Sequence, residues 1–420
     1  MFSLRQEKRA IKIVLALACS VFFLVCMYSI VKYGNATLLG SLEKPDNDDV
    51  KFIRSAWILA ETGTYVYHNP PSPTVFMMPG LSFTLAALTH VFGKFGALTA
   101  LRIIQAVLQT LSLLLVFFIG RKVFNSKVGA AALIINVFYF ADVWVSNLVL
   151  TETFFKFFVL NLVYLSIFAI QGKKTKYYIA AAIAWGLATL FRPTIATYPV
   201  VILIVWLLRK YSFKDILKYS AISAVIFFVI LSPWWIRNYQ VFHRFIPLTL
   251  ATGNPMLQGT YINYDQSSRG TDGLNYNQFK YPADTEIDNN AVEMEIAKYR
   301  LKNLVPKQPL AFVYWYTVGK TFSQINFPFY WISILGINVG AVAAYHAFVL
   351  VFAAFGIVVY FRDKKRSRMG TLLIATIGYF IGVYLPFYAF GRYFYPAMPF
   401  VFIFAAAGVI KLFEKRLTEE

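Results

Sequence analysis

Two adjacent aspartates in the first polar segment are the leading candidates for chemistry. Asp48 and Asp49 begin a stretch whose apolar residues recur at helical spacing, namely Val50, Ile53, Trp57 and Ala60. A carboxylate at such a position can act as a general base or bind a divalent cation. The alternative is helix capping, which favours Asp at this place because the first N–H groups lack partners. We therefore treat Asp48 and Asp49 as candidate catalytic residues and as the candidate ligands of a possible divalent cation.

Other polar side chains lie close to apolar segments. Charged groups at membrane depth are costly and are candidates for function. Glu152 is a third candidate catalytic residue, and Lys156 is a possible substrate-lining residue. These two residues are four apart, so an ion pair within one helix is the alternative. His68 and Tyr393 are further possible substrate-lining residues.

Three arginines stand where apolar segments begin or end, and we expect them to bind a phosphate. They are Arg192, Arg237 and Arg392. Arginine pairs with phosphate through two parallel hydrogen bonds. For Arg237, which follows two tryptophans, an interfacial aromatic belt is the alternative. Carboxylates and arginines on one membrane face suit a phosphate-bearing lipid.

The composition identifies the elements that must position these residues. Of 420 residues, 58% are hydrophobic and only 14% are charged, against about 25% charged in soluble proteins. Long apolar runs predict an all-α, polytopic transmembrane helical bundle with about 10–11 membrane segments. The predicted segments are 13–31, 78–93, 98–120, 128–141, 150–170, 177–191, 194–208, 219–236, 335–361, 370–389 and 394–412. The polar loops of one face should carry amphipathic juxtamembrane helices, including an interfacial helix at 310–327.

The charge pattern predicts the orientation. The net charge of +20 could indicate nucleic-acid binding, but 22 of the 40 basic residues lie at the ends or in short connections. Such clusters mark the cytoplasmic side. We therefore expect no nucleic acid, a multi-pass protein of the plasma (inner) membrane with cytoplasmic N- and C-termini, and a site on the outer face. An odd number of segments conflicts with that topology, so 78–93 or 128–141 should be re-entrant.

Three units are expected along the chain. Residues 1–236 form an N-terminal transmembrane catalytic module that includes the outer loop 32–77. Residues 237–334 form an outer loop with the interfacial helix, which could cap the outer face. Residues 335–420 form C-terminal transmembrane helices. Cys19 and Cys26 both fall in the first span, where packing is the expected role.

Several short motifs, in order, resemble those of the C-type glycosyltransferase (GT-C) superfamily. The chain is similar to protein O-mannosyltransferases and to the aminoarabinose transferases of lipid A from about residue 4 to residue 410. The resemblance rests on Asp48 and Asp49 ahead of Ala56, Leu59 and Gly63, then Pro79-Gly80, Val91-Phe92-Gly93, Thr151-Glu152, and the stretches 186–193, 232–239 and 392–396. It departs at Met77 and Met78, where the mannosyltransferases carry HPP or KPP, and their large soluble outer domain has no counterpart within this sequence.

The resemblance implies an inverting transfer of a single sugar from a polyprenyl-phosphate-linked donor. Asp48 or Asp49 would deprotonate the acceptor hydroxyl, and Arg192, Arg237, Arg392 or a cation would stabilise the leaving phosphate. The acceptor could be a lipid, a glycan or a protein. A lipid-linked glycan polymerase or ligase, a membrane transporter or flippase, and a non-catalytic scaffold are the alternatives.

Overall fold

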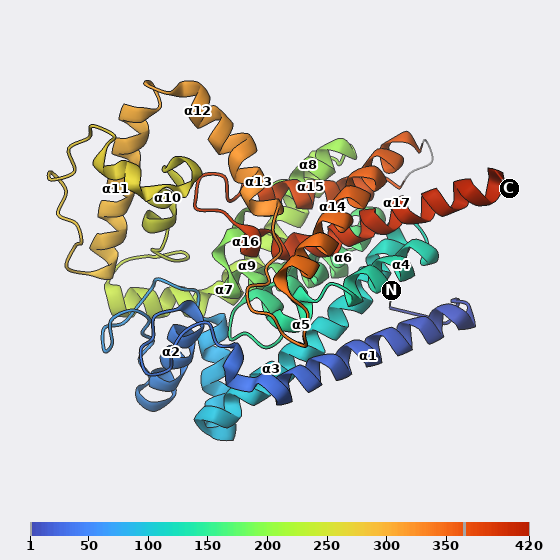
Figure 1. Cartoon of the computed structure of the whole chain (residues 1–420), viewed down its shortest axis with the longest axis horizontal. Coiled ribbons are helices and arrows are strands. Elements are labelled where there is room, and N and C mark those ends of the chain that lie inside the picture. The colour runs from blue at the N-terminus through green and yellow to red at the C-terminus, as the bar shows by residue number, and fades with distance from the viewer. Residues whose placement is uncertain (1, 364–366, 420) are drawn as a thin grey trace.

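Helices make up the fold, and the computed structural model describes residues 2–363 and 367–419 (Figure 1). Within these residues no β-strand forms, which confirms the predicted all-α class. Lys364, Lys365 and Arg366 of the last basic loop lie outside the described residues. The helices are α1 (Arg9–Tyr33), α2 (Asp48–Thr62), α3 (Gly80–Val123), α4 (Ser126–Val137), α5 (Ala141–Val145), α6 (Glu152–Gly172), α7 (Thr175–Phe191), α8 (Pro199–Leu208), α9 (Phe213–Phe242), α10 (Gly253–Gly259), α11 (Glu286–Leu304), α12 (Pro309–Tyr314), α13 (Lys320–Ile325), α14 (Val339–Arg362), α15 (Gly370–Gly382), α16 (Gly391–Phe394) and α17 (Met398–Glu419).

Long apolar helices confirm a multi-pass membrane protein. Six are long and apolar enough to cross a bilayer, and they include α1, α3, α6, α9, α14 and α16 continued into α17. Three shorter apolar helices stand at Ser126–Val137, Pro193–Leu208 and Gly370–Gly382. The segments predicted at 78–93 and 98–120 are joined in α3, which changes direction at Gly93. Gly93 has φ 70°, a left-handed backbone that glycine adopts without steric cost.

The two ends of the bundle differ in character. Both chain termini lie at one end, and α10, α11 and α12 lie at the other (Figure 1). Ion pairs draw basic turns together, with Arg121 2.8 Å from Glu7 and Lys173 2.6 Å from Asp215. The segment around α10 and α11 has a small core of its own, formed by Leu257, Tyr261, Ile296 and Ala297. We call this segment, which lies within the predicted outer unit 237–334, the cap, and the division of the chain into three units remains a prediction.

Close backbone contact joins the C-terminal helices α14 and α17. A Cβ atom added at Gly356 of α14 would collide with the Phe404 carbonyl of α17. One added at Gly408 of α17 would lie 2.5 Å from the Phe352 carbonyl oxygen of α14. Small residues allow helices to approach this closely in membranes, where packing drives association. The contact holds α17 in place, and α17 follows directly on α16 and Arg392.

Gly356→Val should therefore separate α14 from α17. We expect it to lower the free energy of unfolding by about 1–3 kcal/mol, as overpacking does. Thermal unfolding of the detergent-solubilised protein measures the change. Gly378→Val is the matched control, because a Cβ at Gly378 meets no atom within 4 Å. Equal losses in the two variants would contradict the role of the α14–α17 contact.

Candidate active site

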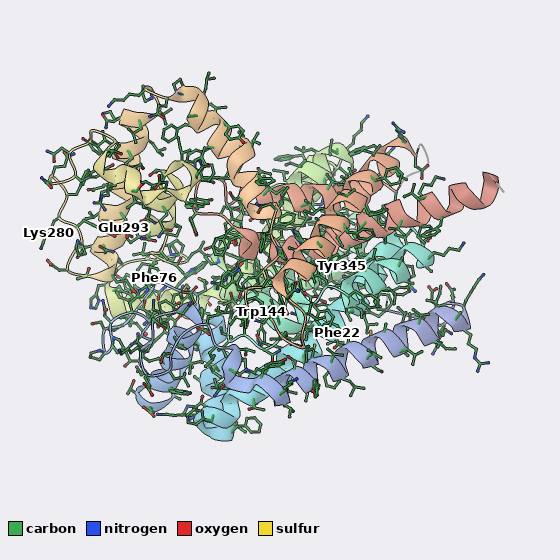
Figure 2. The ribbon with its side chains drawn as sticks, in the orientation of Figure 1. Phe22, Phe76, Trp144, Lys280, Glu293 and Tyr345 are labelled. Carbon is green, nitrogen blue, oxygen red and sulfur yellow. The ribbon has the colours of Figure 1, made fainter. Side chains whose placement is uncertain are left out.

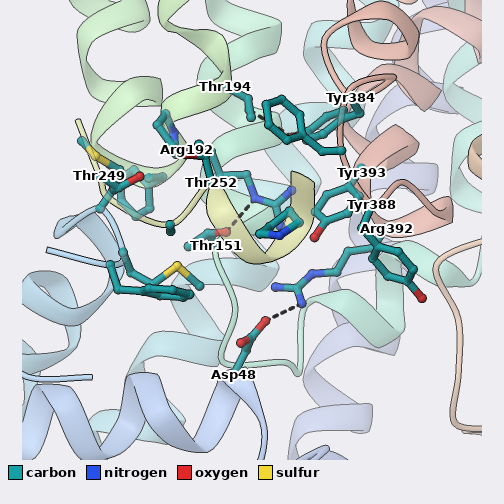
Figure 3. A pocket seen from close by; sticks show the side chains of 18 of the residues that line it. Asp48, Thr151, Arg192, Thr194, Thr249, Thr252, Tyr384, Tyr388, Arg392 and Tyr393 are labelled. Carbon is teal, nitrogen blue, oxygen red and sulfur yellow. Dashed lines mark hydrogen bonds and ion pairs between the residues drawn. The ribbon is translucent and has the colours of Figure 1, made fainter. Parts of the chain in front are cut away.

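A cavity of about 280 Å³ lies where α2, α7, α10 and α16 meet (Figure 3). Its charged lining residues are Asp48, Arg192 and Arg392. Most of the other lining side chains are aromatic, Met, Pro or Thr, and they include Phe76, Tyr388 and Tyr393. An apolar cavity with few convergent polar groups is typical of a binding site.

Asp48 faces this cavity from the first turn of α2. The helix begins at the Asn47 cap, whose side chain accepts a hydrogen bond from the Asp48 N–H. Asp48 Oδ2 accepts from Arg392 Nη1 at 2.8 Å, and Oδ1 accepts from the Tyr67 hydroxyl at 2.9 Å. Burial favours the neutral carboxyl, but Arg392 and then Tyr67 outweigh it and hold the pKa of Asp48 below its ordinary value. Asp48 is therefore a carboxylate at neutral pH.

Asp49 points away from the cavity, although it is the next residue. Its side chain is fully buried. Oδ2 accepts from the Leu39 N–H at 2.6 Å and Oδ1 from the Val50 N–H at 2.8 Å. Burial raises its pKa despite these bonds. The contacts tie the loop after α1 to the start of α2.

Glu152, at the first residue of α6, lies behind the cavity and is fully buried. Its Oε1 accepts hydrogen bonds from Arg192 Nη2 and Arg392 Nε. Arg392 therefore bridges Glu152 and Asp48. The predicted ion pair between Glu152 and Lys156 is not formed, because Glu152 is occupied by the two arginines.

Local backbone geometry places Arg192 at the cavity. α7 ends at Phe191, and Arg192 is extended ahead of Pro193, as the residue before proline prefers. Its Nε donates to Thr151 Oγ1 at 2.9 Å. Gly80 allows α3 to reach this point, since a Cβ there would lie 2.6 Å from the Leu190 carbonyl oxygen. Within the described residues, the buried Arg192 Nη1 and Glu152 Oε2 have no hydrogen-bond partner.

A buried polar network fixes the segment that follows Arg392. Tyr395, three residues further on, donates to Asp142 Oδ1 at 2.5 Å. Lys156 Nζ lies 2.8 Å from Asp142 Oδ2 and donates to the Tyr395 hydroxyl at 3.0 Å. Gln109 Nε2 donates to the same hydroxyl at 2.9 Å. The network connects α3, α5 and α6 to the segment that carries Arg392.

Of the remaining predicted residues, one lines the cavity and three lie elsewhere. Tyr393 lines the cavity, whereas Lys156 belongs to the buried network. Arg237 is not among the lining residues, and its Nη1 donates to the Thr74 carbonyl at 2.7 Å. His68 lines a second cavity, where its Nδ1 lies 2.6 Å from Glu286 Oε1. Arg237 thus holds the outer loop against α9.

Tyr67, Tyr395 and Asp142 were not singled out from the sequence. Asp142 carried a usable signal, because an acidic residue inside an apolar region needs a partner. The tyrosines carried none, since the chain contains 27 of them. Their importance comes from hydroxyl groups aimed at carboxylates from distant parts of the chain.

The fold is similar to that of a solved membrane glycosyltransferase, in agreement with the resemblance found in the sequence. The apo structure of the Archaeoglobus fulgidus oligosaccharyltransferase aligns with a TM-score of 0.60 and 14% identity, over 98% of this chain and 52% of that one. The same enzyme tethered to an acceptor peptide gives 0.55 and 15%, over 97% and 50%. ArnT from Cupriavidus metallidurans bound to undecaprenyl phosphate gives 0.44 and 14%, over 94% and 77%. The chain spans about half the length of the archaeal enzyme.

Within that class, one family gives a direct sequence match. The sequence model of the dolichyl-phosphate-mannose-protein mannosyltransferase family matches residues 72–236. This stretch contains Glu152 and Arg192. A comparison with curated proteins found no match. The match covers less than half of the chain, and the fold is similar over nearly all of it.

Protein groups occupy the oxygen atoms of both aspartates in this structure. Both Asp49 oxygens accept backbone hydrogen bonds, and Asp48 is paired with Arg392. In the part of the chain that the structure describes, no three His, Cys, Asp or Glu side chains are placed to hold a metal ion. A further structure of the archaeal enzyme is a complex with Zn and sulfate. The divalent cation expected at Asp48 and Asp49 therefore stays a prediction.

Lys156→Met should leave the Asp142 carboxylate buried without its cation. We expect a loss of about 3–5 kcal/mol in the free energy of unfolding, as when one partner of a buried ion pair is removed. Asp142→Asn combined with Lys156→Met removes both charges and should recover most of the loss. Thermal unfolding in detergent compares the variants. A double variant no more stable than the single one would contradict the pairing.

Proposed function

We propose that this protein transfers a single sugar from a polyprenyl-phosphate-linked donor to an acceptor hydroxyl, with inversion, at the outer face of the plasma membrane. The carrying observation is the convergence of Asp48, Arg192 and Arg392 on one apolar cavity. A base and two phosphate-binding groups are the parts that such a transfer requires. The oligosaccharyltransferase likeness concerns the fold alone, so the proposal rests on the site.

The donor phosphate binds between the two arginines. Arg192 and Arg392 are only 8% and 7% exposed, and buried guanidinium groups form strong hydrogen bonds with phosphate. The Nη1 atom of Arg192 is buried and has no hydrogen-bond partner in the described structure, and a phosphate oxygen would supply one. The apolar lining suits the first isoprene units. A cavity of about 280 Å³ is just below the usual range of about 300–1,000 Å³ for drug-sized ligands, which supports one sugar rather than a long glycan.

The chemical step needs one base and one stabilised leaving group. Asp48 takes the proton of the acceptor hydroxyl as the oxygen attacks the anomeric carbon. The bond from that carbon to the phosphate oxygen breaks, and the lipid phosphate leaves with the electron pair. Arg192 and Arg392 stabilise the charge that develops on it.

Arg392 couples donor binding to the base. Without donor, Asp48 and Glu152 share its guanidinium. A phosphate that draws Arg392 toward itself weakens the pair with Asp48 and raises the pKa of that carboxylate, which makes Asp48 a stronger base. Glu152 acts as a positioning residue that keeps both arginines at the cavity.

The charge distribution supports the orientation. The basic turns linked by Arg121–Glu7 and Lys173–Asp215 carry the Lys and Arg excess of a cytoplasmic surface. The cap of α10 and α11, which faces the cavity, is at the opposite end of the bundle (Figure 1). The site then opens on the outer side, with both termini in the cytoplasm.

Asp48→Asn should reduce transfer by about 10²–10⁴-fold, the usual contribution of a general base. A mass-spectrometric profile of membrane glycolipids in source cells compares wild type, a deletion strain and the variant at equal protein levels. The deletion and Asp48→Asn should accumulate the same polyprenyl-phosphate monosaccharide. A variant profile equal to wild type would make Asp48 a helix-capping residue. Asp49→Asn is the control. Any change that it causes in the glycolipid profile should be explained by a change in the amount of protein.

Tyr67→Phe should move the acid limit of activity to higher pH. Asp48 works as a base only when ionised, so kcat/KM falls as the pH drops through its lowered pKa. Loss of the Tyr67 hydrogen bond removes one cause of the lowering, so the pKa rises. The pH profile is measured with the donor identified in the glycolipid profile. Tyr384→Phe, a change in the same cavity at a hydroxyl bonded to Thr194, should leave the acid limit in place.

A further inference from the structure

A second and larger cavity, of about 490 Å³, lies in the cap beside the first. Unlike the first, its lining is mostly polar. The lining residues come from the 68–69 and 281–285 loops, from α10 and from the start of α11. We call this cavity the polar chamber, and its polar side chains include His68, Asn254, Tyr281, Asn289, Glu286 and Glu293.

Phe76 is the wall between the polar chamber and the cavity of Asp48. It lines both spaces. The His68 ring packs edge-on against Phe76 at 4.4 Å between centroids, and the preceding residue, Tyr67, donates to Asp48. Figure 2 shows Phe76 near Glu293 of α11, with Lys280 further out. The candidate base therefore stands close to the boundary of the two spaces.

Hydrogen bonds hold two carboxylates of the chamber in place. Glu286 lies 2.6 Å from His68 Nδ1 through Oε1, and its Oε2 accepts from Thr74 at 2.6 Å. Glu293, only 4% exposed, accepts from Asn254 at 2.8 Å and from Tyr281 at 3.1 Å. These carboxylates are fixed groups rather than mobile surface charges.

The two cavities differ in the charged side chains that line them. The first is lined by Arg192 and Arg392, whose charges are balanced by Asp48 in the lining and by Glu152 behind it. The polar chamber is lined by three carboxylates and by no lysine or arginine, and of the three Asp284 is paired with Lys280. Phosphate can pair with the arginines of the first cavity, whereas the chamber offers it no lysine or arginine and repels it through Glu286 and Glu293. Fixed amides, carboxylates and a tyrosine hydroxyl are the groups that bind sugar hydroxyls.

We propose that the polar chamber is the acceptor subsite and that it selects a carbohydrate head group that is uncharged or carries an amine. The inference rests on the proposed function, since it assigns the acceptor side of that same reaction. A hydroxyl of the bound sugar reaches Asp48 past Phe76. Acidic sugars and phosphorylated polymers are excluded because the carboxylates of the chamber would repel their negative charges.

Binding of three synthetic glycosides to the full-length protein in nanodiscs tests the chamber without donor. The probes are octyl glucoside, octyl glucosaminide and octyl glucuronide, titrated below micelle formation by calorimetry. The neutral and amine-bearing probes should bind at least about tenfold more tightly than the acidic one, equivalent to about 1.4 kcal/mol. Glu286→Gln with Glu293→Gln should reduce this ratio to about threefold or less. Glu295→Gln is the matched control, because Glu295 is an exposed carboxylate on the same helix, and it should preserve the ratio.

A second variant provides a test that does not depend on the folding of the Glu286→Gln, Glu293→Gln double variant. Asn289→Asp adds a carboxylate of the same shape to the chamber and should increase discrimination against the glucuronide. Equal binding of the three probes by wild type, or an equal effect of Glu295→Gln, would overturn the proposal. Binding of a neutral Ser/Thr peptide in place of the glycosides would overturn it as well.

The donor side is tested separately in the same nanodiscs. Undecaprenyl phosphate should bind, and Arg192→Ala should weaken it at least about tenfold without changing glycoside binding. If the glycosides behave as expected and undecaprenyl phosphate binding does not depend on Arg192, the proposed donor site fails and the chamber remains a carbohydrate site. If undecaprenyl phosphate binding depends on Arg192 but the glycosides do not behave as expected, the donor site stands and the chamber assignment fails.

Discussion

The carboxylate of Glu152 is buried completely, and the site depends on how that charge is neutralised. An isolated carboxylate in such a place would cost several kcal/mol. Two guanidinium groups, Arg192 and Arg392, approach one of its oxygens. They come from the end of α7 and from α16, which are separated by 200 residues of sequence. A single buried anion therefore brings two distant cations to the wall of one cavity.

The same constraint extends to the next layer of side chains. Arg392 can keep its position only if the segment after it is fixed, and Tyr395 fixes it through Asp142 and Lys156. Each charge in this layer is paired with an opposite one, as low-dielectric surroundings require. The structure thus contains two adjacent ion-pair groups, each neutral overall. Only the group that contains Arg192 and Arg392 reaches the cavity, and the pair of Asp142 and Lys156 lies next to it.

Two neighbouring aspartates in the first turn of α2 make different contacts. Successive residues of the first turn point in different directions around the helix axis. Asp48 consequently faces the cavity and Arg392, while Asp49 binds the N–H of Leu39 and closes the preceding loop. Asp49 is engaged in backbone hydrogen bonds, and Asp48 is the member of the pair that stays a candidate for chemistry.

Composition and periodicity by themselves determined the helical membrane class, the amphipathic helix that carries Asp48, and the candidate status of Arg192 and Arg392. These features are local, because hydropathy and turn chemistry act within a few residues. Only the tertiary structure decided that Glu152 pairs with the arginines and not with Lys156, that Arg237 binds the Thr74 carbonyl, and that His68 lies in a separate chamber. The physical reason is that a buried charge pairs with whichever opposite charge the packed helices bring near it, and sequence separation does not limit that choice.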